Sequence, residues 1–176
     1  MRFRFDITQL MLLALFTTVY RRTRNSFVPE AVSFSPDGEA VAARWTDGTV
    51  NIYSGDGQRL GSFDASDDWF SITDRGAFQL LDDETILTTD QQGRFQIWES
   101  GHDTPQATFG TPGFGLGQSA AVSRDGVTAA TVRFGATPGV DIWNIETRKS
   151  AALPGRRGSP AAVVLSDDGS RIATLG

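Results

Sequence analysis

The stretch AVSFSPDGEAVAARWTDGTVNIYSGDGQRLGSF (Ala31–Phe63) decides the fold. It contains four short segments separated by three glycine-containing turns, P-D-G, T-D-G and G-D-G. Apolar residues alternate within the segments, as in Val32 and Phe34 or Val50 and Ile52, so each segment has one apolar face. Glycine permits the positive φ of tight hairpins, and aspartate hydrogen-bonds the backbone of its own turn. The stretch therefore predicts an antiparallel meander of four strands.

The same arrangement recurs along the chain with a period near 45 residues. A second copy covers residues 77–109 and a third covers residues 119–153. The isoleucines of the expected third strands are 45 residues apart, at Ile52, Ile97 and Ile142. The first-turn aspartates, Asp37, Asp83, Asp125 and Asp168, are separated by 46, 42 and 43 residues. Two independent markers with one period indicate an internal repeat.

The repeat resembles that of WD40-like β-propellers. The matching features are the turn FSPDG (34–38), the third strands DGTVNIY (47–53) and GRFQIW (93–98), and GQRL (57–60) at the entry to a fourth strand. A four-stranded blade of about 40–45 residues is typical of that family. The resemblance covers residues 26–176 and implies an all-β fold with three complete four-stranded antiparallel blades and half of a fourth. The expected blades cover residues 26–63, 77–109, 119–153 and 161–176.

The sequence departs from the family pattern in one respect. No Gly-His pair precedes a first strand, and the one histidine, His102, lies in a turn between a third and a fourth strand. The resemblance therefore implies that the buried Asp-His-Ser-Trp network of typical WD40 blades does not form, and that Asp47 occupies its Asp position without a His partner. The chain looks like a divergent bacterial form of the repeat.

The fourth copy contains two strands around the turn Ser166–Gly169. Closed propellers have four to eight blades, so this array leaves strand edges open. Three interpretations follow: a fragment of a longer gene product, which we favour; assembly of several copies or with a partner chain; or an open array whose last hairpin pairs with residues 26–34.

Residues 1–24 differ from the rest of the chain in charge and hydropathy. They carry a net charge of +4, against −9 for residues 25–176, and an apolar run from Ile7 to Tyr20 lies between cationic flanks. A helix of this length spans about 21 Å, shorter than a hydrocarbon core of roughly 30 Å. Cationic flanks are not needed by a buried core helix, and no small-x-small cleavage site precedes Arg21. We expect an uncleaved membrane anchor or signal-anchor helix whose orientation is open, because both flanks are positive.

The body of the chain lacks residue sets for familiar chemistries. Absence of cysteine excludes disulfides and thiolate sites, and the acidic body disfavours nonspecific nucleic-acid binding. No G-x-S-x-G surrounds a serine.

The glycines at 113, 115 and 117 precede a strand rather than the helix that a phosphate loop needs. The acidic loop with Asp64, Asp67, Asp68 and Asp74 does not fit an EF-hand. Asp82-Asp83-Glu84 is interpreted as an altered, solvated P-D-G turn. We expect no enzyme, cofactor or metal site.

These observations favour a membrane-tethered, noncatalytic scaffold for protein–protein contacts in a bacterial cell membrane, on a side that the sequence leaves open. The expected contact residues are Trp69, Phe70 and Phe114, in the two long inter-blade loops. The partner is an unidentified protein, and the open blade edges also offer a route to self-association. The alternative is the propeller portion of a larger enzyme or ligand-binding protein whose catalytic part lies beyond residue 176.

Overall fold

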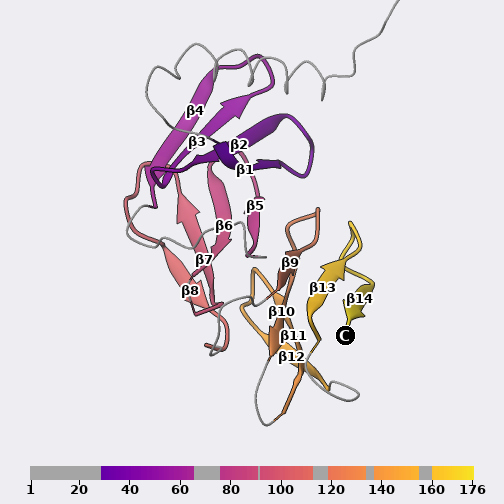
Figure 1. Ribbon diagram of the computed structural model, residues 1–176. Coiled ribbons are helices and arrows are strands. Elements are labelled where there is room, and N and C mark those ends of the chain that lie inside the picture. Colours follow the sequence, from indigo (N-terminus) through magenta and orange to yellow (C-terminus); the bar gives the residue numbers. More distant parts are fainter. Residues whose placement is uncertain (1–28, 66–75, 91, 113–118, 134–136, 155–159) are drawn as a thin grey trace, which may run out of the picture.

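The computed structural model describes residues 29–65, 76–90, 92–112, 119–133, 137–154 and 160–176 (Figure 1). Every regular element in these ranges is a β-strand, which confirms the all-β expectation. The helix expected over residues 7–20 lies outside the described residues. Within the described ranges, no helix is long and apolar enough to cross a membrane.

The strands form three four-stranded antiparallel sheets and one two-stranded hairpin. The first sheet contains β1 (Pro29–Phe34), β2 (Ala40–Trp45), β3 (Thr49–Ser54) and β4 (Arg59–Asp64). The second contains β5 (Phe78–Leu80), β6 (Thr85–Thr89), β7 (Phe95–Glu99) and β8 (Ala107–Phe109). The third contains β9 (Ala120–Val122), β10 (Thr128–Arg133), β11 (Gly139–Asn144) and β12 (Ser150–Pro154), and the C-terminal hairpin contains β13 (Ala162–Leu165) and β14 (Ile172–Leu175). Each sheet follows the chain order, as a meander does.

A recurring Ser-x-Asp-Gly turn, which we call the serine–aspartate turn, closes several of these hairpins. Between β1 and β2, the Ser35 hydroxyl donates to Asp37 Oδ1 at 2.6 Å, and the same oxygen accepts the Glu39 amide at 3.0 Å. Ser35 Oγ also accepts the Ala40 amide at 2.9 Å, which joins the turn to β2. Gly38 adopts φ 79°, a conformation that disfavours a side chain. Sequence and geometry thus agree on why this four-residue pattern repeats.

Alternation along the strands buries both faces of the middle sheets. Val50, Ile52 and Phe63 of the first sheet pack against Leu80, Ile86 and Trp98 of the second. The neighbouring Leu87 and Phe95 point to the other side and pack with Ala129 and Trp143 of the third sheet. Val132 and Val140 of the third sheet pack with Val163 of the hairpin. Each pair of successive sheets therefore shares its own apolar core.

Side chains on the first strands, or directly before them, join neighbouring sheets by hydrogen bonds. Ser33 Oγ on β1 accepts the Leu80 amide of β5 at 2.9 Å, and Gln79 Nε2 donates to the Phe34 carbonyl at 3.1 Å. Ser119 Oγ accepts the Val163 amide of β13 at 3.1 Å. These bonds satisfy backbone groups that the short strands β5 and β13 would otherwise leave buried and unpaired.

The sheets follow one another in chain order (Figure 1), an arrangement compatible with propeller-like blades. Among the described strands, β1 pairs with β2 and β14 pairs with β13, so no pairing joins the hairpin to β1. The pairing of the last hairpin with residues 26–34 is therefore not observed for the described part of that segment, residues 29–34.

Candidate functional site

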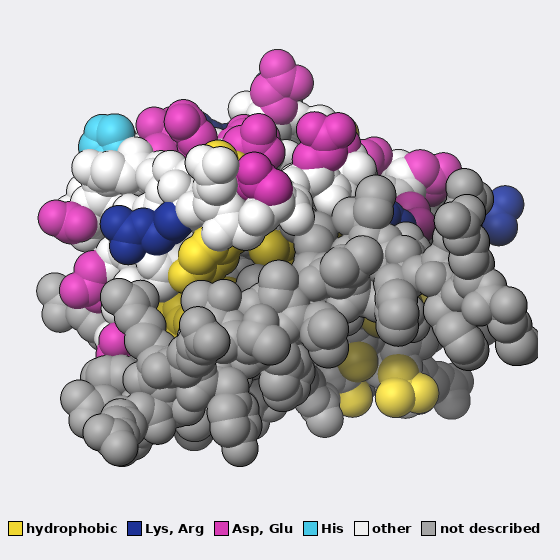
Figure 2. Space-filling model, turned by 90° about the horizontal axis from the view of Figure 1, so that it is seen from above, with side chains coloured by type: hydrophobic (Ala, Val, Ile, Leu, Met, Phe, Trp, Pro, Cys, Tyr) yellow, Lys and Arg dark blue, Asp and Glu magenta, His cyan; other side chains and the backbone are white. Residues whose placement is uncertain are grey.

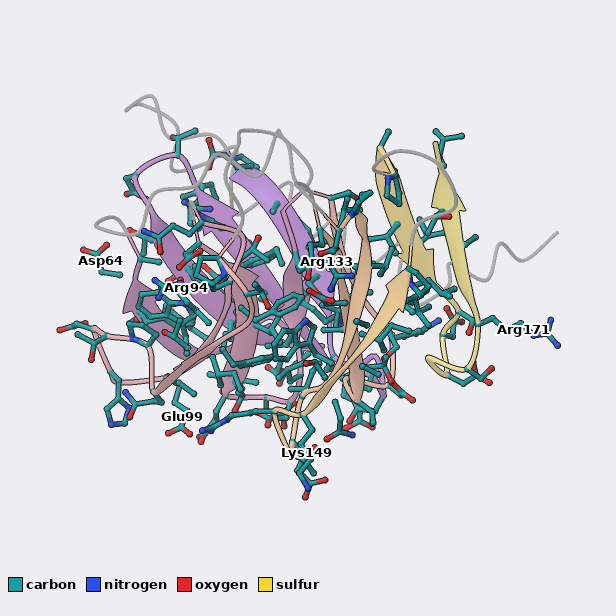
Figure 3. All side chains as sticks on the ribbon, turned by 90° about the horizontal axis from the view of Figure 1, so that it is seen from below. Asp64, Arg94, Glu99, Arg133, Lys149 and Arg171 are labelled. Carbon is teal, nitrogen blue, oxygen red and sulfur yellow. The ribbon has the colours of Figure 1, made fainter. Side chains whose placement is uncertain are left out.

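The sheets present two rims with different connections. One rim, which we call the hairpin rim, carries the turns that join the first to the second strand and the third to the fourth strand of each sheet. The opposite rim carries the turns between second and third strands. In Figure 3, Glu99 and Lys149 project from the hairpin rim, whereas Asp64 lies toward the opposite rim.

A groove of about 830 Å³ opens on the hairpin rim between the first and second sheets. Its walls come from the β1–β2, β5–β6 and β7–β8 turns, so residues far apart in the sequence share it. The lining residues are Ser35, Pro36, Asp37, Leu81, Asp82, Asp83, Glu84, Thr85, Glu99, Ser100 and His102. None of these described lining residues is Lys or Arg. In Figure 2, Asp and Glu side chains gather along this rim, at the upper edge of the view.

Two of the groove carboxylates stabilise the turns that carry them. The Ser35 hydroxyl and then the Glu39 amide lower the pKa of Asp37, because both hydrogen bonds favour the ionised carboxylate. Asp82 Oδ1 accepts the amides of Glu84 at 2.9 Å and Thr85 at 2.8 Å. The Asp82-Asp83-Glu84 segment is therefore a turn with exposed carboxylates, as the sequence predicts.

The other three carboxylates are available for contacts. Asp83, Glu84 and Glu99 are exposed, and within the described part of the chain their side chains form no hydrogen bond or ion pair. A cluster of like charges on a concave surface produces a negative potential that attracts cations and cationic segments. The groove is thus chemically suited to bind positive charge.

A close approach between two sheets sets the position of the groove. A Cβ at Gly61 of β4 would lie 2.0 Å from Ser100 Oγ, so only glycine allows the β7–β8 turn to pack against β4. His102 follows in that turn, where the sequence places it, and is exposed. Its backbone amide donates to the Glu99 carbonyl at 3.2 Å, which closes the turn.

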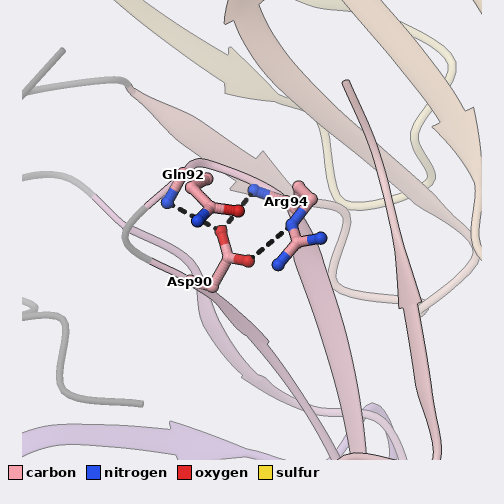
Figure 4. Close-up of polar contacts among 3 residues, drawn as sticks. All are labelled: Asp90, Gln92 and Arg94. Carbon is pink, nitrogen blue, oxygen red and sulfur yellow. Dashed lines mark hydrogen bonds and ion pairs between the residues drawn. The ribbon is translucent and has the colours of Figure 1, made fainter. Parts of the chain in front are cut away.

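Two connections on the opposite rim contain buried carboxylates paired with arginines. Asp90 follows β6 and accepts hydrogen bonds from the amides of Gln92 and Arg94, each at 2.8 Å, and from Arg94 Nε at 2.7 Å (Figure 4). Only 6% of the Asp90 side chain is exposed. In the third sheet, Arg133 forms an ion pair with buried Asp141. These internal pairs organise the β6–β7 and β10–β11 connections, unlike the exposed carboxylates of the groove.

A two-residue polar contact within the second sheet was not anticipated from the sequence. Trp98 Nε1 donates to Thr88 Oγ1 at 3.0 Å. The network expected to be missing is built from Asp, His, Ser and Trp side chains. The contact between Thr88 and Trp98 joins only two side chains and does not include His102. The signal for it is the spacing of Thr88 and Trp98, which antiparallel pairing of β6 with β7 brings together.

The residues predicted to contact a partner, Trp69, Phe70 and Phe114, lie outside the described residues, as do Asp67, Asp68, Asp74 and the glycines at 113, 115 and 117. Asp64 ends β4 and is exposed. Among the described residues, no group of three or more His, Asp or Glu side chains is placed to hold a metal ion. The groove itself was not predicted, because it forms only where turns from two sheets meet.

The described sheets are compatible with propeller-like blades, and their strands carry the 45-residue period. No protein-family model matches this chain, and no curated protein matches it either.

Proposed function

We propose that this chain is a noncatalytic, WD40-like propeller scaffold that binds a protein partner through the groove on the hairpin rim. The observation that carries the proposal is the open groove itself, which spans two sheets and whose lining contains five carboxylates and no Lys or Arg. Because the groove is acidic, we expect a Lys- or Arg-containing segment of the partner to occupy it. The stacked sheets provide a rigid base for the turns that would contact it.

Exposure of the groove carboxylates favours binding over acid–base catalysis. A catalytic acid or base needs a desolvated environment or a close charge partner that adjusts its proton affinity. Asp82, Asp83 and Glu84 instead occupy the solvent side of a turn. His102 is likewise exposed, and its ring forms no hydrogen bond with a described residue. The groove therefore supports reversible electrostatic contact.

The proposed family and tether rest on the sequence pattern. The 45-residue period, the serine–aspartate turns and the four-stranded meanders support a WD40-like propeller. The apolar run over residues 7–20, flanked by arginines, supports attachment to a membrane.

A matched pair of variants tests the groove. We expect the full chain to bind a Lys/Arg octapeptide and not a Glu octapeptide, with affinity that falls as salt is added. Asp83→Asn/Glu84→Gln should weaken binding about fivefold, because two contact charges are lost. Glu146→Gln/Asp167→Asn changes net charge equally at turns outside the groove and should leave the affinity almost unchanged. Calorimetric titration measures both, and equal losses in the two variants would refute the groove as the binding surface.

Membrane attachment needs a separate test. We expect the full chain to stay with membranes during alkaline carbonate extraction. Leu12→Arg/Leu13→Arg should release it, because charged side chains at the centre of an apolar helix disfavour insertion. Release of the unsubstituted chain by carbonate would refute the tether and leave the groove proposal intact.

A further inference from the structure

The sequence contains five Asp-Gly pairs, and all of them lie in described hairpin turns. Aspartate followed by glycine is the dipeptide most open to backbone isomerisation, because glycine has no side chain to hinder ring closure. The five pairs begin at Asp37, Asp47, Asp56, Asp125 and Asp168. Their chemical fates should differ, because their hydrogen-bond environments differ.

Four of the pairs belong to serine–aspartate turns. In each, the serine hydroxyl two residues earlier donates to Oδ1 of the aspartate. The distance is 2.6 Å for Asp37 and Asp125 and 2.7 Å for Asp168, and Ser54 forms the same bond to Asp56. The same Oδ1 accepts the amide two residues later. Two donors on one oxygen fix the rotation of the carboxylate and hold Oδ1 away from the following backbone nitrogen.

The β2–β3 turn lacks this second donor. Trp45 occupies the position that serine holds in the other four turns, and its indole Nε1 has no hydrogen-bond partner in the described structure. Asp47 Oδ1 accepts only the Thr49 amide, at 2.9 Å, and the side chain is exposed. The Asp47 carboxyl is therefore the least restrained of the five.

We propose that Asp47 is the isoaspartate-forming site of this protein, and that the serine–aspartate turns protect the other four Asp-Gly pairs. The Gly48 backbone nitrogen attacks Cγ of the neutral Asp47 carboxyl. The amide proton and the carboxyl hydroxyl leave as one water molecule, and a five-membered succinimide forms. Water then adds to either ring carbonyl and gives aspartate or isoaspartate. The sequence of steps returns the water that it released and involves no redox change.

The neutral carboxyl is the reactive form, since a carboxylate has no comparable leaving group. In the turns of Asp37, Asp56 and Asp168, the serine hydroxyl is the main cause of a lowered carboxyl pKa, which reduces the neutral fraction. In agreement, the Ser166 hydroxyl and the Ser170 amide lower the pKa of Asp168 to about 2. Each unit by which a carboxyl pKa falls reduces the neutral fraction about tenfold near neutral pH.

Isomerisation at Asp47 would change the local backbone. Isoaspartate adds one methylene to the main chain of the β2–β3 turn. Gly48 donates its amide to the Trp45 carbonyl at 2.9 Å, and its carbonyl accepts the Ala65 amide at 3.1 Å. The added methylene would break this link between the turn and the end of β4.

The test is chemical ageing of the full chain at physiological temperature and mildly acidic pH. Isoaspartate is then quantified by methyltransferase labelling and located by peptide mass spectrometry with electron-transfer fragmentation. We expect several-fold more isoaspartate at Asp47 than at each of the other four sites, because Asp47 alone lacks a serine donor to its carboxylate. Equal labelling of the five sites, or more labelling at Asp37 than at Asp47, overturns the proposal.

Two variants separate the serine effect from general unfolding. Ser35→Ala should raise isoaspartate at Asp37 about to the level of Asp47 and leave Asp125 unchanged. Trp45→Ser supplies the missing hydroxyl and should lower the signal at Asp47. Asp47→Glu removes that signal and serves as the assay control. If Trp45→Ser does not fold, the Ser35→Ala result decides: an unchanged Asp37 signal in folded protein refutes the protective role of serine.

Discussion

The interface between the first and second sheets and the interface between the second and third use the same positions in different ways. In the first interface, Phe63 and Trp98 stack nearly parallel, with ring centroids 5.5 Å apart and planes at 8°, and Trp98 donates to Thr88. In the second, Phe109 and Trp143 are 5.8 Å apart and tilted by 57°, and Trp143 Nε1 is buried without a partner. One repeat position thus supports a satisfied contact in one interface and an unsatisfied polar atom in the other.

The difference shows that equivalent positions of the repeat do not by themselves determine how neighbouring sheets contact each other. Both tryptophans follow an isoleucine in a third strand, and both face the preceding sheet. An orphaned buried N–H costs free energy that a paired one does not. We therefore expect the first interface to contribute more to stability than the second.

Truncation of each tryptophan tests whether the first interface contributes more to stability than the second. Trp98→Ala should reduce the free energy of unfolding by about 3–5 kcal/mol, because it removes a stacked ring from a closed core. Trp143→Ala should cost less, about 2–3 kcal/mol, since the lost side chain includes an unpaired N–H. Urea unfolding followed by circular dichroism measures both. A larger loss for Trp143→Ala would invert the ranking of the two interfaces.

Replacement by phenylalanine isolates the contribution of the indole N–H, because it removes that group and retains an aromatic ring. Trp98→Phe leaves Thr88 Oγ1 without its donor and should cost about 1–2 kcal/mol. Trp143→Phe removes the orphaned N–H and should change stability by less than about 0.5 kcal/mol. Thr88→Val provides the complementary measurement, and its cost should vanish in a Trp98→Phe background if the hydrogen bond is its cause.

The sequence predicted the sheets well and the contacts between them poorly. Period, alternation and Asp-Gly turns located the strands, because these are local properties of the chain. Gly61 shows the limit: it looks like an ordinary strand glycine, and only packing against Ser100 explains it. The groove is non-local for the same reason, since Asp37 and Glu99 meet only after two sheets stack. The pairing of Trp98 with Thr88 required knowledge of register.

Side-chain hydrogen bonds between neighbouring sheets should contribute less to stability than the tryptophans, and serine substitutions test them. Ser33→Ala removes the acceptor of the Leu80 amide and should cost about 1–2 kcal/mol, because that amide is buried. Ser119→Ala removes the acceptor of the Val163 amide in the same way, but the C-terminal hairpin it holds is more exposed. We expect amide exchange to accelerate in β13 and β14 for Ser119→Ala and in β5 for Ser33→Ala. Exchange changes spread evenly over all sheets would contradict separate interfaces.

The third interface lies between the third sheet and the C-terminal hairpin. Its described core cluster contains no aromatic residue. Here the turns themselves meet: the Asp125 amide donates to the Asp167 carbonyl at 3.1 Å. The hairpin turn depends on Asp168, whose pKa is lowered to about 2, chiefly by the Ser166 hydroxyl. The side chain is solvent-exposed, so its effect on stability should be the smallest of those considered.

Acidification should therefore act on this interface in a defined direction. Because folding lowers the pKa of Asp168 from 3.8, its contribution is present above pH 3.8 and is lost as the pH falls toward about 2. We expect protection of the β13 and β14 amides to decrease over this range, as measured by hydrogen exchange at several pH values. Ser166→Ala should flatten the dependence, since it removes the main cause of the lowered pKa, whereas Ser150→Ala on β12 should not. An unaltered pH dependence in Ser166→Ala would show that acid acts on the hairpin through another group.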